Sequence, residues 1–454
     1  MARDHLQDDP HRSGDLAEHL ADREHVIVDY KRVRLLWPCH LGLARGKYLP
    51  IATADNGTGH CMALFSQDYD REMDPEIPGT GLLDGLPDLE ATFAPNALRP
   101  GWEPHTAVAV ADVAFEGGDV QMAPRPAAKR AIKAWQDLGY SPQLGIELEA
   151  YLMQPDGAGG WERVPTPGHH VYATGPAADP TGLIDEIMEM ADQVGLPVES
   201  VNTEYDPGQF ELTLHYDDAM KALDDAFLFR LMAREMAMER GLMLTFLGKP
   251  INGSGGSGLH LNLSLLDDDG ANAMADPDGE FGLSDLARGC IAGLLGHLEA
   301  TTALCCPTVN AYKRVRPGEF IPYWANWGLD HRGTTIRVPP ARGAGTRLEH
   351  RLSDGAANPY TAAAAVLHAA RLGVVNDMEC PPVETLDCID EVGTERHVPE
   401  NLGDALTALE SDTELCEAMG PGFTDHFLAL KRTEWKKFLV HVTDWELDHY
   451  LPYL

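Results

Sequence analysis

Four short segments with strand patterns carry acidic or histidine side chains, and polar residues at alternate positions lie on one face of a β-strand. These side chains are Glu147 and Glu149 in GIELEAYLM, Glu204 and Glu211 around the turn DPGQ, His260 in SGLHLNLSL, and Glu349 in TRLEHRLSDGAANPY. Any one segment alone is typical of an exposed strand. Together, five carboxylates and one imidazole suit two or more hard divalent ions such as Mg²⁺ or Mn²⁺, and the oxygen-rich set disfavours zinc.

A second group of residues is cationic and lies in an otherwise acidic chain. Residues 310–339 contain Lys313, Arg314, Arg316, His331, Arg332 and Arg337, and Arg347 and Arg351 alternate with Glu349. Arginine binds carboxylate and phosphate groups through two parallel hydrogen bonds. Divalent ions facing arginines form the arrangement that phosphoryl transfer requires, because the protein mainly positions the reactants and neutralises charge.

The glycine-rich segment NGSGGSG, residues 252–258, does not have the features of a nucleotide-binding P-loop. A strand pattern rather than a helix pattern follows it, and the ending GK[ST] is missing. We therefore expect its backbone to approach a small ligand closely, with a plain turn as the alternative.

The predicted elements that position these residues are strands with polar faces, separated by helices. Strand patterns cover residues 25–34, 46–54, 106–115, 144–153 and 259–265, and helix patterns cover residues 124–140, 179–195, 216–241, 358–373 and a run from about 402 to the end. In the strand at 144–153, Ile146 and Leu148 lie on one face and Glu147 and Glu149 on the other. This order predicts an α+β fold with a mostly antiparallel sheet.

Length and charge restrict the class of protein. The chain has 454 residues and a formal net charge of −36, which argues against nucleic acid or an anionic membrane as a partner. No apolar run is long enough to span a bilayer, and the first residues lack the apolar core of a signal peptide, so we predict a cytoplasmic protein. The eight cysteines show no CxxC pair, which favours free thiols.

In their order along the chain, these motifs resemble the glutamine synthetase family of type I. GIELEAYLM and EYDPGQFEL resemble its two metal-binding strands, GGSGLHLNLSL its glutamate and metal segment, NAYKRVRPG and HRGTTIR its arginine segments, and RLEHRLSDGAANPY its closing signature. Residues 1–24 are polar and predict an N-terminal extension. The resemblance implies a β-grasp domain at 25–112 and a catalytic domain at 113–454 with a barrel-like sheet flanked by helices. It also implies a homo-oligomer, usually a dodecamer of two stacked hexamers, with active sites between subunits.

The same resemblance implies a role for each motif residue. Glu149, Glu204 and Glu211 would hold one metal ion and Glu147, His260 and Glu349 another, with two or three Mg²⁺ or Mn²⁺ ions per site and ATP as co-substrate. Gly256, Arg314 and Arg351 would bind glutamate, and Arg332 and Arg337 would stabilise the transferred phosphate. The ATP-binding positions are Tyr216, Asn262, Ser264, Arg337 and Arg347, and the catalytic arginines are Arg332, Arg337 and Arg351.

The chain departs from ammonia-using members at the position of a glutamate that helps to bind ammonium. Aligning the arginine segments without a gap places Phe320 there and leaves Glu319 one residue early. The family's D-G-S-S turn, which supplies a second acid, is also missing from the segment NGTGHCMALF. An aromatic ring at position 320 favours an alkyl or aryl amine through apolar contact or cation–π attraction.

These departures resemble the branch of the family that makes γ-glutamylpolyamines and other γ-glutamylamides. The sequence therefore predicts an ATP-dependent ligase that joins the γ-carboxylate of glutamate to an organic amine through a γ-glutamyl phosphate. His60, from a neighbouring subunit, is a candidate base for the amine, with a structural or exposed histidine as the alternative. The alternative functions are an ammonia-using glutamine synthetase, which a register slip restoring Glu319 would favour, and a non-catalytic ring-forming member.

Overall fold

The computed structural model describes residues 30–83, 85–318 and 320–454. The predicted extension at 1–24, the first half of the predicted strand at 25–34 and Glu319 lie outside the described residues.

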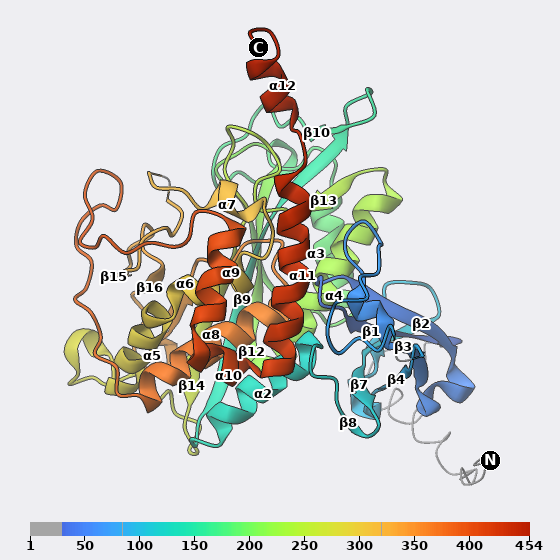
Figure 1. Ribbon diagram of the computed structural model, residues 1–454, viewed down its shortest axis with the longest axis horizontal. Helices are drawn as coiled ribbons and strands as arrows, with labels where there is room; N and C mark the ends of the chain where they lie inside the picture. The colour runs from blue at the N-terminus through green and yellow to red at the C-terminus, as the bar shows by residue number, and fades with distance from the viewer. Residues whose placement is uncertain (1–29, 84, 319) are drawn as a thin grey trace.

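The N-terminal strands form two four-stranded sheets, which lie together at one side of the molecule (Figure 1). The first has the order β2-β1-β6-β5 and consists of β1 (Arg32–Pro38), β2 (Ala44–Pro50), β5 (Arg99–Pro100) and β6 (Thr106–Val110). The second has the order β3-β4-β7-β8 and consists of β3 (Thr58–Cys61), β4 (Asp88–Thr92), β7 (Asp112–Phe115) and β8 (Gly118–Asp119).

The predicted strand at 106–115 is divided between these two sheets. β6 pairs in parallel with β1, whereas β7 pairs antiparallel with β4. The break falls at Ala111, whose backbone N–H donates to the carbonyl oxygen of Leu36 at 2.7 Å. One continuous alternating pattern therefore covers strands of two different sheets. Side-chain periodicity cannot reveal where the chain passes from one sheet to the other.

A nine-stranded sheet forms the centre of the remaining chain. Its strands run in the order β11-β12-β9-β14-β17-β16-β15, and β10 and β13 also pair with β9. They are β9 (Ser141–Pro155), β10 (Trp161–Arg163), β11 (Val198–Thr203), β12 (Gln209–Asp218), β13 (Met243–Thr245), β14 (Leu259–Leu266), β15 (Trp327–Leu329), β16 (Ile336–Val338) and β17 (Leu348–His350).

All pairs in this sheet are antiparallel except β15 with β16, so the predicted α+β fold with a mostly antiparallel sheet is confirmed. The expected barrel-like closure is wrong, because among the described residues no strand pairing joins β15 to β11 at the two ends of the sheet.

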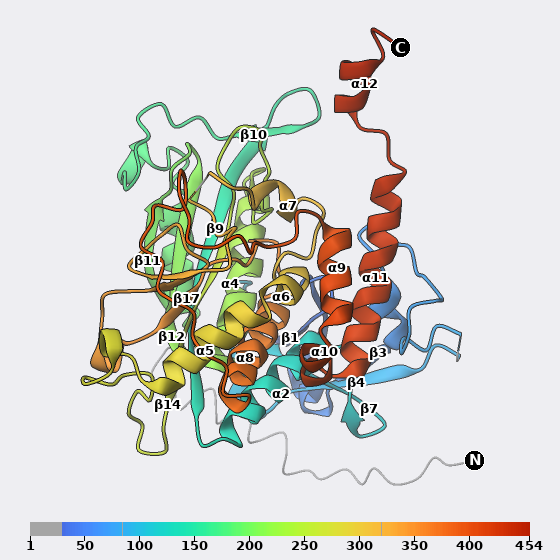
Figure 2. The same cartoon turned by 60° about the vertical axis from the view of Figure 1, so that its left-hand side comes forward.

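Helices gather mainly on one side of the large sheet, as Figure 2 shows for α5, α6 and α8 to α11. The helices are α2 (Pro124–Gln136), α3 (Leu183–Gln193), α4 (Ala219–Glu239), α5 (Asp285–Gly296), α6 (Leu298–Cys305), α7 (Ala311–Arg314), α8 (Pro359–Val375), α9 (Leu402–Ser411), α10 (Thr413–Met419), α11 (Pro421–Leu439) and α12 (Asp444–Tyr450). Short 3-10 helices occupy connections: η1 (Ile51–Asn56), η2 (Met62–Ser66), η3 (Pro95–Ala97), η4 (Gly175–Ala177), η5 (Glu280–Gly282) and η6 (Gly343–Gly345). None of the described helices is long and apolar enough to cross a lipid bilayer.

The helix boundaries follow local chemistry. α2 has proline in its first turn, where the missing N–H costs nothing, and the chain leaves it through Gly139 at a φ of +84°. The Asn358 side chain caps α8 by accepting from the Tyr360 N–H at 3.1 Å. The predicted helical run from 402 breaks at Gly420, where φ is +97°, and its last part, α12, projects from the body (Figure 1).

The core between sheet and helices explains how β9 orients its two faces. Ile146 and Leu148 are almost fully buried in one large apolar cluster with residues of α2, α4 and α8. Burying an aliphatic side chain of this size contributes about 1.5–3 kcal/mol. The opposite face of β9 is thereby fixed, and it carries Glu147 and Glu149.

Candidate active site

The strand register brings the predicted acidic residues together across β9. Glu149 pairs with Glu211 on β12, and Glu147 pairs with His260 on β14. Directly paired residues point to the same face of a sheet, so all four side chains share one surface. Glu204 follows the end of β11, and its N–H donates to the carbonyl of Gln209 at 3.0 Å, which closes the DPGQ turn.

Two groups of these side chains have the spacing of metal ligands. Glu149, Glu204 and Glu211 can bring one ligand atom each within 4.8 Å of the others, and so can Glu147, Glu211 and His260. The first group is the predicted trio. The sequence predicted Glu349 as the third member of the second group, but the structure has Glu211 in that role. Glu211 therefore belongs to both groups.

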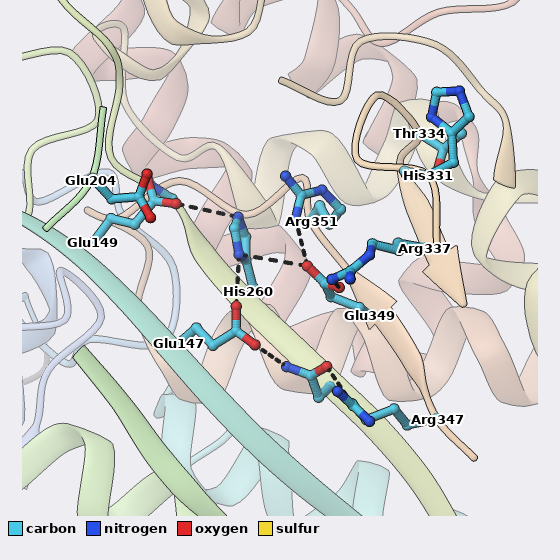
Figure 3. Close-up of polar contacts among 12 residues, drawn as sticks. Glu147, Glu149, Glu204, His260, His331, Thr334, Arg337, Arg347, Glu349 and Arg351 are labelled. Carbon is cyan, nitrogen blue, oxygen red and sulfur yellow. Dashed lines mark hydrogen bonds and ion pairs between the residues drawn. The ribbon is translucent and has the colours of Figure 1, made fainter. Parts of the chain in front are cut away.

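Glu349 lies next to the second group but is held by arginines. Its Oε1 is 3.8 Å from His260 Nδ1. Its Oε1 also accepts from Arg351 at 2.5 Å, and its Oε2 accepts from Arg337 at 2.6 Å. Figure 3 shows His260 between Glu149 on one side and Glu147 and Glu349 on the other. Both oxygens of this buried carboxylate therefore already have cationic partners.

The electrostatics of the cluster indicate that a cation fits between its carboxylates. Burial and the negative charge of Glu147 raise the pKa of Glu211 to about 8, and burial with the charge of Glu149 raises the pKa of Glu204. Burial would also raise the pKa of Glu147, but hydrogen bonds from His260 and Asn262 outweigh it and hold the value at about 2. Carboxylate oxygens with one imidazole are a donor set that suits Mg²⁺ or Mn²⁺.

A row of polar residues continues across the neighbouring strands. Asn262 is opposite Glu349, and Glu349 is opposite Arg337. Asn262 donates to Glu147 Oε1 at 2.8 Å and accepts from Arg347 Nε at 3.1 Å. Asn262 thus connects Glu147 of the carboxylate cluster to Arg347.

The glycine-rich segment 252–258 packs tightly against Arg314. A Cβ at Gly256 would lie 2.6 Å from the Cγ of Arg314 and 2.7 Å from the carbonyl oxygen of Gly248. Arg314 is buried and donates to the carbonyl oxygen of Leu352 at 2.9 Å. Real Cβ atoms do not approach so closely, so this position requires glycine.

Other predicted site residues lie further from the cluster. Arg332 is exposed. Burial and the charge of Glu149 raise the pKa of Glu204, and the positive charge of Arg332 offsets part of this increase. Ser264 shares a strand with Asn262 and pairs with Gln143. Tyr216 is 69% exposed and lies at a register shift in β12, where its direction no longer follows the strand alternation.

The two residues predicted for the amine pocket, Phe320 and His60, differ in their exposure. Phe320 is 68% exposed and follows Glu319, which lies outside the described residues. His60 is only 8% exposed and stacks on Trp37 with ring centroids 4.2 Å apart. Burial lowers the pKa of His60, and its contacts are those of a structural residue within its own chain.

Two acidic residues near the site were missed from the sequence. Asp330 accepts a hydrogen bond from Arg337 at 2.5 Å. Its position directly before the arginine segment HRGTTIR is the feature of the sequence that could have identified it. Asp206 accepts from the Tyr151 hydroxyl at 3.1 Å and from the Gly255 N–H, and it lies within the DPGQ turn itself. Both residues position groups that the sequence did assign to the site.

Comparison with known proteins identifies the family of this chain. A family model described as the glutamine synthetase catalytic domain matches residues 121–450. The chain belongs to the glutamine synthetase family. Members of this family are ATP-dependent ligases that form C–N bonds from glutamate and an amine or ammonia, and they use divalent metal ions.

Relatives within the glutamine synthetase family have more than one amine substrate by name. A glutamine synthetase of Halobacterium salinarum is 35% identical over 378 residues, which are 80% of this chain and 82% of that protein. The γ-glutamylethanolamide synthetase GlnA4 of Streptomyces coelicolor is 33% identical over 443 residues, 93% and 94% of the two chains. A solved structure of GmaS without ligand matches with a TM-score of 0.81 at 30% identity and covers 93% of this chain and 97% of that one.

Proposed function

We propose that this glutamine synthetase family ligase joins the γ-carboxylate of glutamate to a small organic amine. The observation that carries the proposal is Phe320, an exposed aromatic ring at the aligned position of the ammonium-binding glutamate. A cationic NH₄⁺ needs carboxylates to be captured from water, whereas a ring attracts the alkyl chain or ammonium of a larger amine. The likeness to GlnA4, whose name specifies ethanolamide synthesis, supports the same direction.

In the proposed reaction, an oxygen of the γ-carboxylate attacks the γ-phosphorus of ATP, and the bond to ADP breaks. The amine nitrogen then attacks the acyl carbon of the γ-glutamyl phosphate, phosphate leaves, and the nitrogen loses a proton. Divalent ions held by Glu149, Glu204 and Glu211 and by the group around His260 would neutralise the charge of the phosphates.

The chain's own residues have separate tasks in this proposal. Arg314, the backbone at Gly256 and Arg351 orient glutamate, while Arg332 and Arg337 stabilise charge on the transferred phosphoryl group. Glu349 keeps Arg337 and Arg351 in place, because it accepts a hydrogen bond from each. Tyr216, Asn262, Ser264 and Arg347 are proposed for the nucleotide side.

We also propose that the protein assembles as two stacked hexamers, with a β-grasp N-terminal domain at 25–112 completing a neighbour's site. The exposed apolar residues of the projecting C-terminal segment, among them Val440, Trp445 and Leu451, support assembly. Sedimentation velocity tests the ring number, and truncation after residue 439 should reduce it.

The amine preference is tested by measuring phosphate release from ATP with Mg²⁺, glutamate and one amine at a time. The panel contains ammonium, methylamine, ethanolamine, putrescine, spermine and an aromatic amine. We expect turnover with at least one organic amine at a higher kcat/KM than with ammonium, and Phe320→Glu should shift the preference toward ammonium. Turnover with ammonium alone would instead identify an ammonia-using glutamine synthetase, the function named for the Halobacterium relative. Absence of turnover with every amine would favour a non-catalytic ring-forming member.

A further inference from the structure

A cavity lies between α4 and the loop that follows β1, and its lining does not include the carboxylate cluster. Its volume is about 360 Å³, which is within the usual size range of small-ligand pockets. None of the six predicted metal ligands lines it. Most of its wall is apolar and includes Leu41, Phe227, Leu231, Leu244 and Phe246.

Two arginines one helical turn apart on α4, Arg230 and Arg234, line this cavity. Within the described part of the chain, neither guanidinium lies within 4.0 Å of a carboxylate oxygen. The next residue of the same helix, Glu235, is paired with Arg34 at 2.5 Å, so acids in this region do find cationic partners. Arg230 is partly buried and Arg234 is exposed, so the pair places two positive charges at the cavity wall, and water solvates Arg234.

Two contacts hold the Arg230 side chain at the cavity, and the charges of Tyr69 and Asp354 act on it from nearby. Its NH1 group donates to the carbonyl oxygen of Ala357 at 2.7 Å, and its guanidinium lies 4.9 Å from the ring centre of Phe246. Burial and the charge of Arg234 lower the pKa of Arg230 to about 10. The one carboxylate that lines the cavity, Glu434, already accepts from Lys431 at 2.7 Å.

An occupant that satisfies both parts of the cavity has an anionic end and an apolar body. We propose that this cavity binds a small organic carboxylate, with its anionic end at Arg230 and Arg234 and its apolar body against α4 and β13. Arginine pairs with carboxylate through two parallel hydrogen bonds, and the apolar wall contributes about 25 cal/mol for each Å² removed from water.

The cavity shares a segment of backbone with the proposed glutamate site. Residues 351–358 supply the Ala357 carbonyl that accepts from Arg230 and the Leu352 carbonyl that accepts from Arg314. An occupant that moves Arg230 would therefore change the KM for glutamate. This effect on turnover rests on the proposed function, whereas binding itself does not.

Calorimetric titration of the full chain tests the binding. We expect hexanoate and 3-phenylpropionate to bind with a stoichiometry of one per chain, and hexylamine and hexanol not to bind. Arg230→Gln and Arg234→Gln should each weaken hexanoate binding at least tenfold. The matched control Arg240→Gln, which removes a cation just after α4 that is paired with Glu186, should leave it unchanged.

Four results would each overturn the proposal: no heat with either carboxylate, equal binding of hexylamine, unchanged affinity in both arginine variants, or strictly competitive displacement of hexanoate by glutamate with Mg²⁺ and a non-hydrolysable ATP analogue. Coupling through residues 351–358 predicts only a limited change of hexanoate affinity when glutamate is bound. If Arg230→Gln does not fold, Arg234→Gln changes an exposed side chain and Leu231→Trp fills the cavity, and each should abolish or weaken binding. Because no step requires turnover, failure here is distinct from failure of the amine ligase proposal.

Discussion

Glu211 belongs to both candidate metal groups, and its replacement by glutamine should have opposite effects with and without metal. Burial and the charge of Glu147 raise the pKa of Glu211 from 4.5 to about 8. A raised carboxyl pKa means that the metal-free folded protein holds a proton that the unfolded chain releases. Its stability is therefore greatest below pH 4.5 and falls as the pH rises toward 8.

The size of this effect follows from the pKa difference. At pH 7.5, ionising Glu211 in the folded state costs about 4 kcal/mol of folding free energy, because each pKa unit corresponds to about 1.36 kcal/mol and about three units separate pH 7.5 from the unfolded pKa. Because part of the Glu211 side chain contacts solvent, we expect roughly half of this. Glu211→Gln should thus stabilise the metal-free protein by about 2 kcal/mol at pH 7.5, and the gain should disappear near pH 4.5.

With metal the order should reverse. Mg²⁺ bound only by the folded state stabilises it by mass action. The variant lacks a ligand shared by both groups, so saturating Mg²⁺ should raise its unfolding midpoint much less than that of the wild type.

The assay is urea unfolding at pH 4.5 and pH 7.5, in EDTA and in excess Mg²⁺. The control is Glu199→Gln, an exposed carboxylate on β11 that lies 3.7 Å from His215, which should change stability by less than about 0.5 kcal/mol. The reasoning is refuted if Glu211→Gln destabilises the EDTA-treated protein at pH 7.5, or if Mg²⁺ stabilises variant and wild type equally.

Three further predictions concern single contacts. Gly256→Ala should raise the KM for glutamate at least tenfold, measured by phosphate release, because its Cβ would displace Arg314. Arg337→Gln leaves Glu349 with one cationic partner and should lower kcat about 100-fold with a smaller change in the KM for ATP, measured by steady-state kinetics. The wild type should lose about 2 kcal/mol of unfolding free energy between pH 7.5 and pH 5 because of His426, and His426→Gln should not show this part of the loss in urea unfolding. Burial lowers the pKa of His426 to about 4, so its contribution is complete above pH 6.5 and is lost as the pH falls toward 4.

Much of the cluster could be predicted because strands alternate their side chains with a period of two. That period alone placed Glu147 and Glu149 opposite Ile146 and Leu148, and the buried apolar pair confirms it. The partner of each residue across the sheet could not be predicted this way, because register depends on the turns and neighbouring strands. The sequence therefore did not show that Glu211 sits opposite Glu149, or that Arg337 sits opposite Glu349.

The remaining differences have local causes. The strand predicted at 106–115 continues its alternation through Ala111, although the chain changes sheets there. The closing helical run is interrupted where Gly420 adopts a positive φ and Pro421 follows. The 3.6-residue period of apolar side chains does not indicate this interruption. The aromatic stacking of His60 on Trp37 depends on a contact between separate strands, and the sequence offered no signal for it.

The length of β9 has a consequence for how such an enzyme can change its amine. This single strand of 15 residues pairs with four others and carries Glu147 and Glu149, so an insertion of one residue would turn both carboxylates into the apolar core. Phe320, in contrast, lies outside every strand of the large sheet. Under the proposed function, new amine specificity would arise by substitutions and insertions in the loop that contains Phe320, because the strand register that fixes the carboxylates would stay unchanged.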